Sequence, residues 1–308
     1  MNTVELHKET MPEIADAQAS ETSLAKCTIS SCIPDTDVIL FLGEIRTGIY
    51  VQWQKLLKKL AGNHKGKALV LMCTVGGNPH DAFRMMRLLQ AQYKVIDVAI
   101  LGGCYSAGTL FALGASKIQM SRSANLGPLD IQLRKEDDFV RISGECYRQA
   151  LSDLSTVARQ IFMDQFVELK SCQDILISTQ TASHAAADIV KGLISPITGQ
   201  IEPTKLGEMM RSQRIGISYA MRLMSVNYGE DASRFIANKL AREYPSHDTV
   251  IDYEEARKLG LNVEIIDTQS WAAGIFQAVE EQMLENGGFG LPNIKCLNDE
   301  TVVPAGCK

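Results

Sequence analysis

The stretch Val95-Ile-Asp-Val-Ala-Ile-Leu-Gly-Gly-Cys-Tyr-Ser-Ala-Gly-Thr-Leu-Phe-Ala-Leu-Gly-Ala115 decides the fold. It opens with an apolar run that has the length of a buried strand, and from Thr109 onward its composition is helical. Between these parts, Gly102-Gly103 predicts a sharp turn that leaves Ser106 at the start of the helix. A serine there could attack a carbonyl carbon while backbone amides hold the oxyanion. It could also be the N-cap of the helix, the commonest role of a serine in this position.

Two strand-and-helix pairs precede this stretch. Apolar runs at 37–43 and 68–73 predict buried strands, and helical spacing at 47–60 and 80–92 predicts amphipathic helices. Strands that alternate with helices favour parallel βαβ units with right-handed crossovers. No strand is followed by GxGxxG, so a Rossmann dinucleotide-binding domain is disfavoured. The sequence therefore predicts an α/β protein.

The pattern becomes almost wholly helical from residue 144 to residue 240. After it, a last strand is expected at 262–266 and a last helix at 271–284. We predict one α/β domain over 37–285 that carries a long helical insertion at about 135–245. A polar N-terminal arm, 1–36, precedes this domain, and a tail of irregular structure, 286–308, follows it.

Composition excludes several functional classes. The 308 residues are 45% hydrophobic and 22% charged, with a formal net charge of −5. These values are ordinary for a soluble globular protein and argue against nucleic acid or an anionic membrane as a partner. The apolar runs are too short for a transmembrane segment, and residues 1–20 do not resemble a secretory signal. The eight cysteines include no CxxC pair, so a zinc cluster is not expected. Cys73 and Cys104 lie in apolar runs, as reduced core thiols do, and without a secretory signal this favours a cytoplasmic location. No motif indicates a cofactor, and we expect none.

A second glycine pair follows the strand at 68–73, in Thr74-Val-Gly-Gly-Asn-Pro79. The carboxyl ends of neighbouring parallel strands face one crevice, where ligands bind in α/β sheets. An amide from Gly76-Gly77 and the amide that follows Ser106 could therefore converge on a single oxyanion. This pairing favours a hydrolytic site over a simple helix cap.

Three blocks of sequence resemble the Clp protease/crotonase superfamily. The first is the glycine turn at 74–79, and the second joins 105–115 to Ser123-Ala-Asn-Leu-Gly-Pro-Leu-Asp-Ile-Gln132. The third is Ser246-His-Asp-Thr-Val-Ile-Asp-Tyr-Glu-Glu-Ala-Arg-Lys-Leu-Gly-Leu-Asn-Val263. Within the superfamily the chain is most similar to the serine dehydrogenase proteinase family, which is related to signal peptide peptidase A-like serine proteases. The resemblance implies a ββα superhelix with a long helical insertion.

The resemblance also implies roles for particular residues. Ser106 takes the place of the nucleophile, and the amides of Gly77 and Ala107, with the turn at Gly76, take the place of the oxyanion hole. Val75 stands where the family has proline.

The general base is a more open question. At or next to Asp130, where Clp-type proteases carry a histidine, this chain has none. In one mechanism His247 takes the Ser106 proton while Asp130 or Asp248 orients the imidazole ring. In the other, a desolvated lysine acts as the base, as in the signal peptide peptidase relatives, and Lys135 is the nearest candidate downstream.

We expect a serine endopeptidase that cleaves peptides or unfolded protein through an acyl-enzyme, without an ATPase of its own. The family resemblance implies a homo-oligomer, a trimer or a hexamer. The alternative is a catalytically weakened scaffold that binds a peptide or a partner protein. An acyl-CoA enzyme of the crotonase type is disfavoured because no pair of glutamates lies near Asp130.

Overall fold

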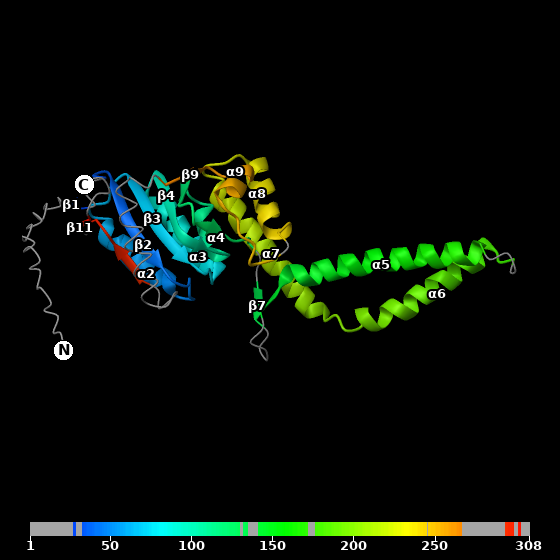
Figure 1. The fold of residues 1–308 in the computed structure, drawn as a ribbon. Helices are drawn as coiled ribbons and strands as arrows, with labels where there is room; N and C mark the ends of the chain where they lie inside the picture. The colour runs from blue at the N-terminus through cyan, green and yellow to red at the C-terminus, as the bar shows by residue number, and fades with distance from the viewer. Residues whose placement is uncertain are drawn as a thin grey trace, which may run out of the picture.

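A sheet of seven strands forms the centre of the molecule (Figure 1). The computed structural model describes residues 27–28, 33–129, 132–134, 141–171, 176–244, 246–266, 293–298 and 301–302. The sheet has the order β10-β2-β3-β4-β5-β9, and β6 pairs with β4. Its strands are β2 (Thr36–Leu42), β3 (Lys67–Thr74), β4 (Val95–Cys104), β5 (Lys117–Met120), β6 (Asn125–Leu126), β9 (Val263–Ile265) and β10 (Asn293–Cys296).

All neighbours in this sheet are parallel except β10, which runs antiparallel to β2 at the edge. The crossovers include α2 (Ile49–Leu60), α3 (Pro79–Gln92) and the short α4 (Ala107–Ala112). The predicted α/β class and its parallel βαβ units are confirmed.

Both faces of the sheet are buried, which explains the continuous apolar runs of its strands. One face packs with α2, α3 and α4, and Trp53 of α2 lies edge-on to Phe41 and Phe111, with ring centroids 6.3 and 5.8 Å away. Side chains that alternate with this set form a second cluster, which includes Val38, Leu40, Leu69, Leu71, Ala99 and Leu101. Because both faces of β3 and β4 are buried, the turns that follow these strands start from fixed positions.

The second half of the chain is helical, as predicted. Its helices are α5 (Gly144–Ser171), α6 (Thr179–Thr198), α7 (Pro203–Met224) and α8 (Glu230–Arg242). Figure 1 shows α5 and α6 projecting from the body as a long arm, while α7 returns to it. There α7 contacts α3, α4 and α8. A short antiparallel pair, β7 (Gln132–Arg134) and β8 (Arg141–Ser143), precedes the arm, and α9 (Tyr253–Lys258) follows α8.

The expectation of an irregular tail is wrong for Asn293–Cys296, which forms the edge strand β10. Thr301–Val302 (β11) also pairs with Cys27–Thr28 (β1). Asn298 explains the attachment, because its amide donates to Asp37 at 2.8 Å and its carbonyl accepts from the backbone of Val38 at 2.9 Å. The helix predicted at 271–284 and most of the predicted N-terminal arm lie outside the described residues.

Candidate functional site

The strand before the candidate nucleophile is longer than the sequence suggested. A turn at Gly102-Gly103 is wrong, because β4 continues through both glycines to Cys104. There it pairs with β6, so that Gly103 faces Asn125. A Cβ atom on Gly103 would lie 2.4 Å from Cε2 of Tyr105. The glycine therefore makes room for the Tyr105 ring, and the sharp turn falls at Tyr105 and Ser106.

Ser106 has a strained backbone. It is the one non-glycine residue with a positive φ among those the structure describes, with φ 51° and ψ −109°. Such a conformation costs about 1–3 kcal/mol and persists only where the surroundings impose it. The residue occupies the N-cap position of α4, but its side chain makes no capping hydrogen bond. The N-cap role of the hydroxyl is therefore not the reason for this serine.

The glycine turn after β3 lies against Ser106. A Cβ atom on Gly76 would lie 2.5 Å from the carbonyl oxygen of Tyr105, 3.0 Å from Cβ of Ser106 and 3.2 Å from the amide nitrogen of Ala107. The backbone of Tyr105 donates to the carbonyl of Thr74 at 3.0 Å, which ties the ends of β3 and β4 together. The two turns that the sequence paired are thus in contact.

The loop before α2 holds the glycine turn from its other side. The amide of Ile45 donates to the carbonyl of Gly76, and the amide of Asn78 donates to the carbonyl of Ile45, both at 2.7 Å. Gly77 has φ 133°, and a Cβ atom there would lie 2.4 Å from the carbonyl oxygen of Ile45. Only glycine fits so close an approach, so the turn is fixed before any ligand arrives.

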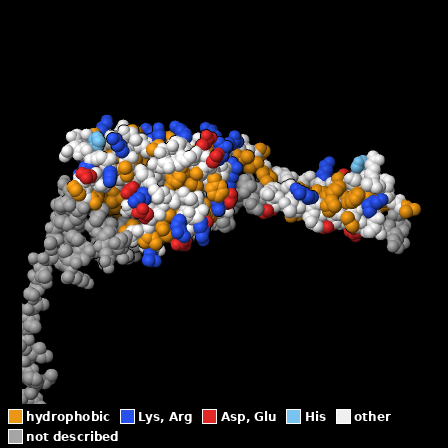
Figure 2. Space-filling model, turned by 90° about the horizontal axis from the view of Figure 1, so that it is seen from above, with side chains coloured by type: hydrophobic (Ala, Val, Ile, Leu, Met, Phe, Trp, Pro, Cys, Tyr) orange, Lys and Arg blue, Asp and Glu red, His pale blue; other side chains and the backbone are white. Residues whose placement is uncertain are grey.

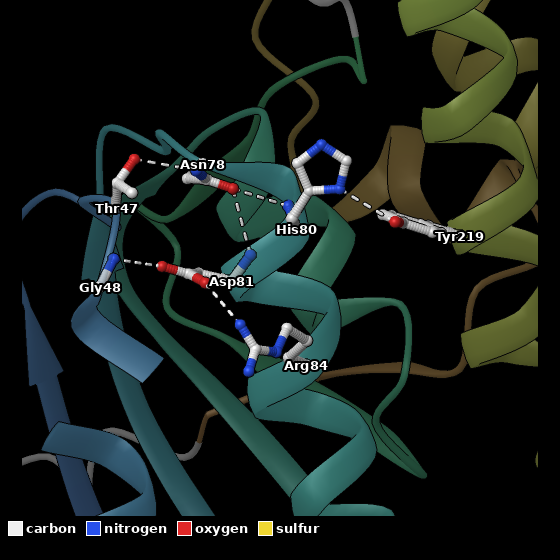
Figure 3. Close-up of polar contacts among 7 residues, drawn as sticks. All are labelled: Thr47, Gly48, Asn78, His80, Asp81, Arg84 and Tyr219. Atoms are coloured by element: carbon white, nitrogen blue, oxygen red, sulfur yellow. Dashed lines mark hydrogen bonds and ion pairs between the residues drawn. The ribbon is translucent and has the colours of Figure 1, made fainter. Parts of the chain in front are cut away.

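Figure 3 shows how the start of α3 is attached to the same loop. Asn78 is the N-cap of α3, and its carbonyl accepts from the amides of His80 at 2.9 Å and Asp81 at 3.2 Å. Its amide nitrogen donates to the hydroxyl of Thr47 at 3.0 Å. The buried carboxylate of Asp81 accepts from the amide of Gly48 at 2.6 Å. Local capping therefore positions the turn from the helix side as well.

Two amides at this junction are not used by the hydrogen bonds that join its described residues. Within the described residues, the N–H groups of Gly77 and Ala107 take no part in the hydrogen bonds that fix the two turns. Ala107 opens α4, where a first-turn N–H has no partner inside the helix. The amide of Gly76 is committed, because it donates to Oγ1 of Thr74 at 3.0 Å.

The segment with His247 and Asp248 approaches the same strand end. Ile251 and Leu126 exchange backbone hydrogen bonds, each 2.9 Å, and Leu126 is paired with Cys104. Nδ1 of His247 is buried. The pKa of Tyr105 is raised, first by burial, and the nearby carboxylate of Asp248 is one of the smaller causes. The structure therefore brings this segment to the neighbourhood of Ser106.

Two other candidates cannot be placed. Asp130, a possible partner of the histidine, and Lys135, the alternative base, both lie outside the described residues. Their roles stay predictions.

Sequence reasoning missed Thr109. Its buried hydroxyl lies 2.9 Å from the carbonyl oxygen of Cys104 and 2.8 Å from that of Gly127. It thereby holds the first turn of α4 against the end of β4 and the loop after β6. A threonine three residues after the candidate nucleophile, inside an apolar helix, was the available signal.

The part of the chain that the structure describes contains neither a metal-binding cluster nor a membrane-spanning helix. There, no group of three or more His, Cys, Asp or Glu side chains could hold a metal ion. None of the described helices has the length and hydropathy needed to cross a membrane.

No protein-family model matches the chain. An uncharacterized protein of Methanocaldococcus jannaschii is 26% identical over 212 residues, which cover 68% of this chain and 58% of that protein. The match thus spans little more than half the length of this relative.

The fold is similar to solved structures of proteases at low sequence identity. One is a mutant of the membrane-bound stomatin-specific protease 1510-N (TM-score 0.43, 14% identity, 75% of this chain and 78% of that one). A second mutant of 1510-N was solved in complex with a substrate peptide (TM-score 0.42, 13% identity, 89% and 88%). A third structure is a peptidase from Plasmodium falciparum (TM-score 0.37, 11% identity, 75% and 95%).

Proposed function

We propose that the protein is a serine peptidase that cleaves peptides or unfolded protein through an acyl-enzyme at Ser106. One observation carries the proposal. Ser106 is held in a strained conformation at the end of a buried strand, makes no capping bond, and lies against the glycine turn at Gly76. Strain of this kind concentrates at functional sites, where it presents a side chain in a fixed direction.

In this proposal the oxyanion is held by the amides of Gly77 and Ala107. Both belong to turns whose backbones are fixed by several hydrogen bonds and close contacts. Donors that are already oriented stabilise developing charge without a cost of reorganisation during the reaction.

His247 is the proposed general base. It would accept the proton of the Ser106 hydroxyl as Oγ bonds to the substrate carbonyl carbon, and then give that proton to the departing amine. In the second step, water would give a proton to His247 and bond to the acyl carbonyl carbon; the bond from that carbon to Oγ of Ser106 would break, and the imidazolium would return the proton to Oγ. Asp248 or Asp130 would orient the imidazolium, and Lys135 is the alternative base. The approach of the 246–251 segment to β4 supports the histidine.

We further propose a cytoplasmic homo-oligomer, a trimer or a hexamer, that needs no cofactor. Figure 2 shows hydrophobic side chains gathered on the arm. On these helices, Val157, Met163 and Val167 of α5 and Leu193 and Ile197 of α6 are each about half exposed. Exposed apolar patches of this kind support burial in an assembly.

The test is covalent labelling with a fluorophosphonate probe, followed by intact-mass measurement. We expect one label on the wild-type protein and none on Ser106→Ala. The matched control is Ser152→Ala, which removes an exposed hydroxyl on the arm and should label normally. His247→Ala should slow labelling by about 100-fold or more, the usual contribution of a general base.

If the wild type takes no label, Ser106 is not an activated nucleophile and the peptidase proposal fails. The alternative, a scaffold that binds a peptide without cleaving it, would then better explain the glycine turn and the turn at Ser106.

A further inference from the structure

Three helices meet on the outer surface near the candidate site. The guanidinium of Arg84 in α3 stacks over the ring of Tyr50 in α2 at 3.9 Å from the centroid. Arg222 of α7 covers the ring of Phe83 in α3 at 4.6 Å. The joined surface, which we call the basic aromatic face, comprises Tyr50, His80, Arg84, Tyr219 and Arg222. We include the exposed Arg87, which lies three residues after Arg84 on α3.

This face begins three residues after Gly77. Figure 3 shows His80 at the first turn of α3, directed to Tyr219 of α7, with Nδ1 of His80 and the Tyr219 hydroxyl 2.9 Å apart. The ring of Tyr219 in turn stacks on Phe83, with centroids 4.1 Å apart. A chain bound at Ser106 that continued past the glycine turn would therefore reach α3 at His80.

The charge of the three helices differs from that of the whole molecule. Together α2, α3 and α7 contain nine Lys or Arg and two Asp or Glu, whereas the chain contains 31 and 36. One of those two acids, Asp81, is only 5% exposed. The outer side of α2 and α3 thus presents cations, among them Lys58, Arg84 and Arg87, without an exposed carboxylate.

We propose that the basic aromatic face binds an acidic segment of the polypeptide substrate. This inference rests on the proposed peptidase function and names the substrate class: chains that carry clustered Asp or Glu beside the segment bound at Ser106. An opposite charge on the partner would speed encounter and fix the register of the bound chain.

The stacked arginines have the geometry to bind carboxylates. A guanidinium held against a ring is already oriented, so it loses little rotamer freedom when it binds the two oxygens of a carboxylate. Figure 3 also shows Arg84 paired with the buried Asp81, with Nη1 3.7 Å from Oδ1, and this ion pair helps to fix its orientation. Phe83 is only 8% exposed and lies beneath Arg222, so it offers no surface for base stacking. Surfaces rich in Arg and Tyr are also typical of protein interfaces.

Binding is tested on the full chain with Ser106→Ala, so that the result does not depend on catalysis. A fluorescein-labelled peptide with four consecutive Glu is compared with the same peptide carrying Gln, by anisotropy at low and moderate salt. We expect binding of the Glu peptide to be about tenfold tighter and to weaken as salt rises. The double variant Arg84→Gln/Arg222→Gln should lose this preference.

Two further variants keep the test decisive. Arg87→Glu leaves both stacks in place and should weaken binding of the Glu peptide several-fold. Arg257→Gln, an exposed arginine on α9 that pairs with Glu254, is the matched control and should change nothing. Equal affinity for the two peptides, or a preference that survives in both face variants, would overturn the proposal.

Tighter binding of an oligonucleotide or a phosphatidylserine vesicle, lost in the same variants, would also overturn it. Fluorophosphonate labelling reports on Ser106 alone, so a failure of the peptidase proposal is seen separately.

Discussion

At the scale of single residues, Ser106 should store measurable strain. Glycine adopts a φ of 51° without a steric penalty, whereas alanine keeps the strain and removes only the hydroxyl. We expect Ser106→Gly to be more stable than Ser106→Ala by about 1 kcal/mol, after the entropic cost of glycine is subtracted. Denaturant unfolding of the two variants measures this difference. Equal midpoints would mean that the turn relaxes and imposes no strain.

The packing of the Tyr105 ring should position Ser106, the next residue in the chain. Its ring lies against Gly103 and Gly127, where added Cβ atoms would come within 2.4 and 2.8 Å of it. Tyr105→Phe keeps the ring and should keep the fluorophosphonate labelling rate, whereas Tyr105→Leu should slow labelling by about tenfold or more, because small misplacements of reacting groups are costly.

The pH profile separates the ring of Tyr105 from its hydroxyl. Burial raises the pKa of Tyr105 above its usual value near 10, so the hydroxyl stays protonated throughout the neutral range. The labelling profiles of wild type and Tyr105→Phe should therefore coincide below pH 10. A new ionisation in the variant within that range would show that the hydroxyl takes part in the chemistry.

At the scale of elements, a buried carboxylate fixes the edge of the sheet. Asp37 at the start of β2 is 0% exposed and accepts from the hydroxyl of Tyr93 at 2.8 Å, the amide of Lys65 at 2.9 Å and the side chain of Asn298 at 2.8 Å. Asp37→Ala would leave these donors without their acceptor and should cost about 2–4 kcal/mol in free energy of unfolding. Asp35→Ala, two residues earlier and exposed, should cost less than about 0.5 kcal/mol. Similar losses in both variants would contradict a specific stabilising role for the buried Asp37 carboxylate.

The same contact predicts a loss of stability in alkali. Burial, and then the hydrogen bond to Asp37, raise the pKa of Tyr93 above 10. The unfolded chain releases this proton near pH 10 and the folded chain only at higher pH, so the free energy of unfolding falls as pH rises through that range. Tyr93→Phe should flatten the fall, as measured by urea unfolding at pH 9 to 11. An unchanged slope would assign the loss to other groups.

These elements show what local sequence can and cannot predict. β3 and the first part of β4 could be predicted from their apolar composition alone, because both faces of each strand are buried. The extension of β4 through Gly102-Gly103 could not be predicted, since glycine pairs ordinarily mark turns. Here Gly103 makes room for the ring of Tyr105, and Gly102 has a positive φ of 151° inside the strand. Likewise β10 forms because β2 offers an edge and Asn298 reaches Asp37, a contact 261 positions away in the chain.

The candidate site also has residues that the sequence could predict and residues that it could not. Ser106 and the glycine turn could be nominated from strand ends and spacing, and the structure places them in contact. The role of Thr109 depends on two carbonyl groups that only the fold brings together. A net charge of −5 also concealed the basic aromatic face, because an average over the chain contains no information on where charges lie.

At the scale of the whole molecule, the body and the arm differ in how they are stabilised. In β3 every residue from 68 to 74 is buried, whereas none from 150 to 171 in α5 is, and α6 buries Ala182 and Ala186. Helical periodicity predicted these helices but not their projection from the body, because it identifies an apolar stripe without identifying what covers that stripe.

Amide hydrogen exchange should separate the two parts. Since isolated helices are stabilised mainly by packing, amides of α5 and α6 in dilute protein should exchange at least about 100-fold faster than those of β3 and β4. Mass spectrometry of peptides from each element measures this ratio. Raising the protein concentration should slow exchange in the arm and leave the sheet unchanged, because assembly would bury the exposed residues of α5 and α6 and thereby stabilise those helices. Arm protection equal to that of the sheet at every concentration would contradict both the projecting arm and its role in the homo-oligomer.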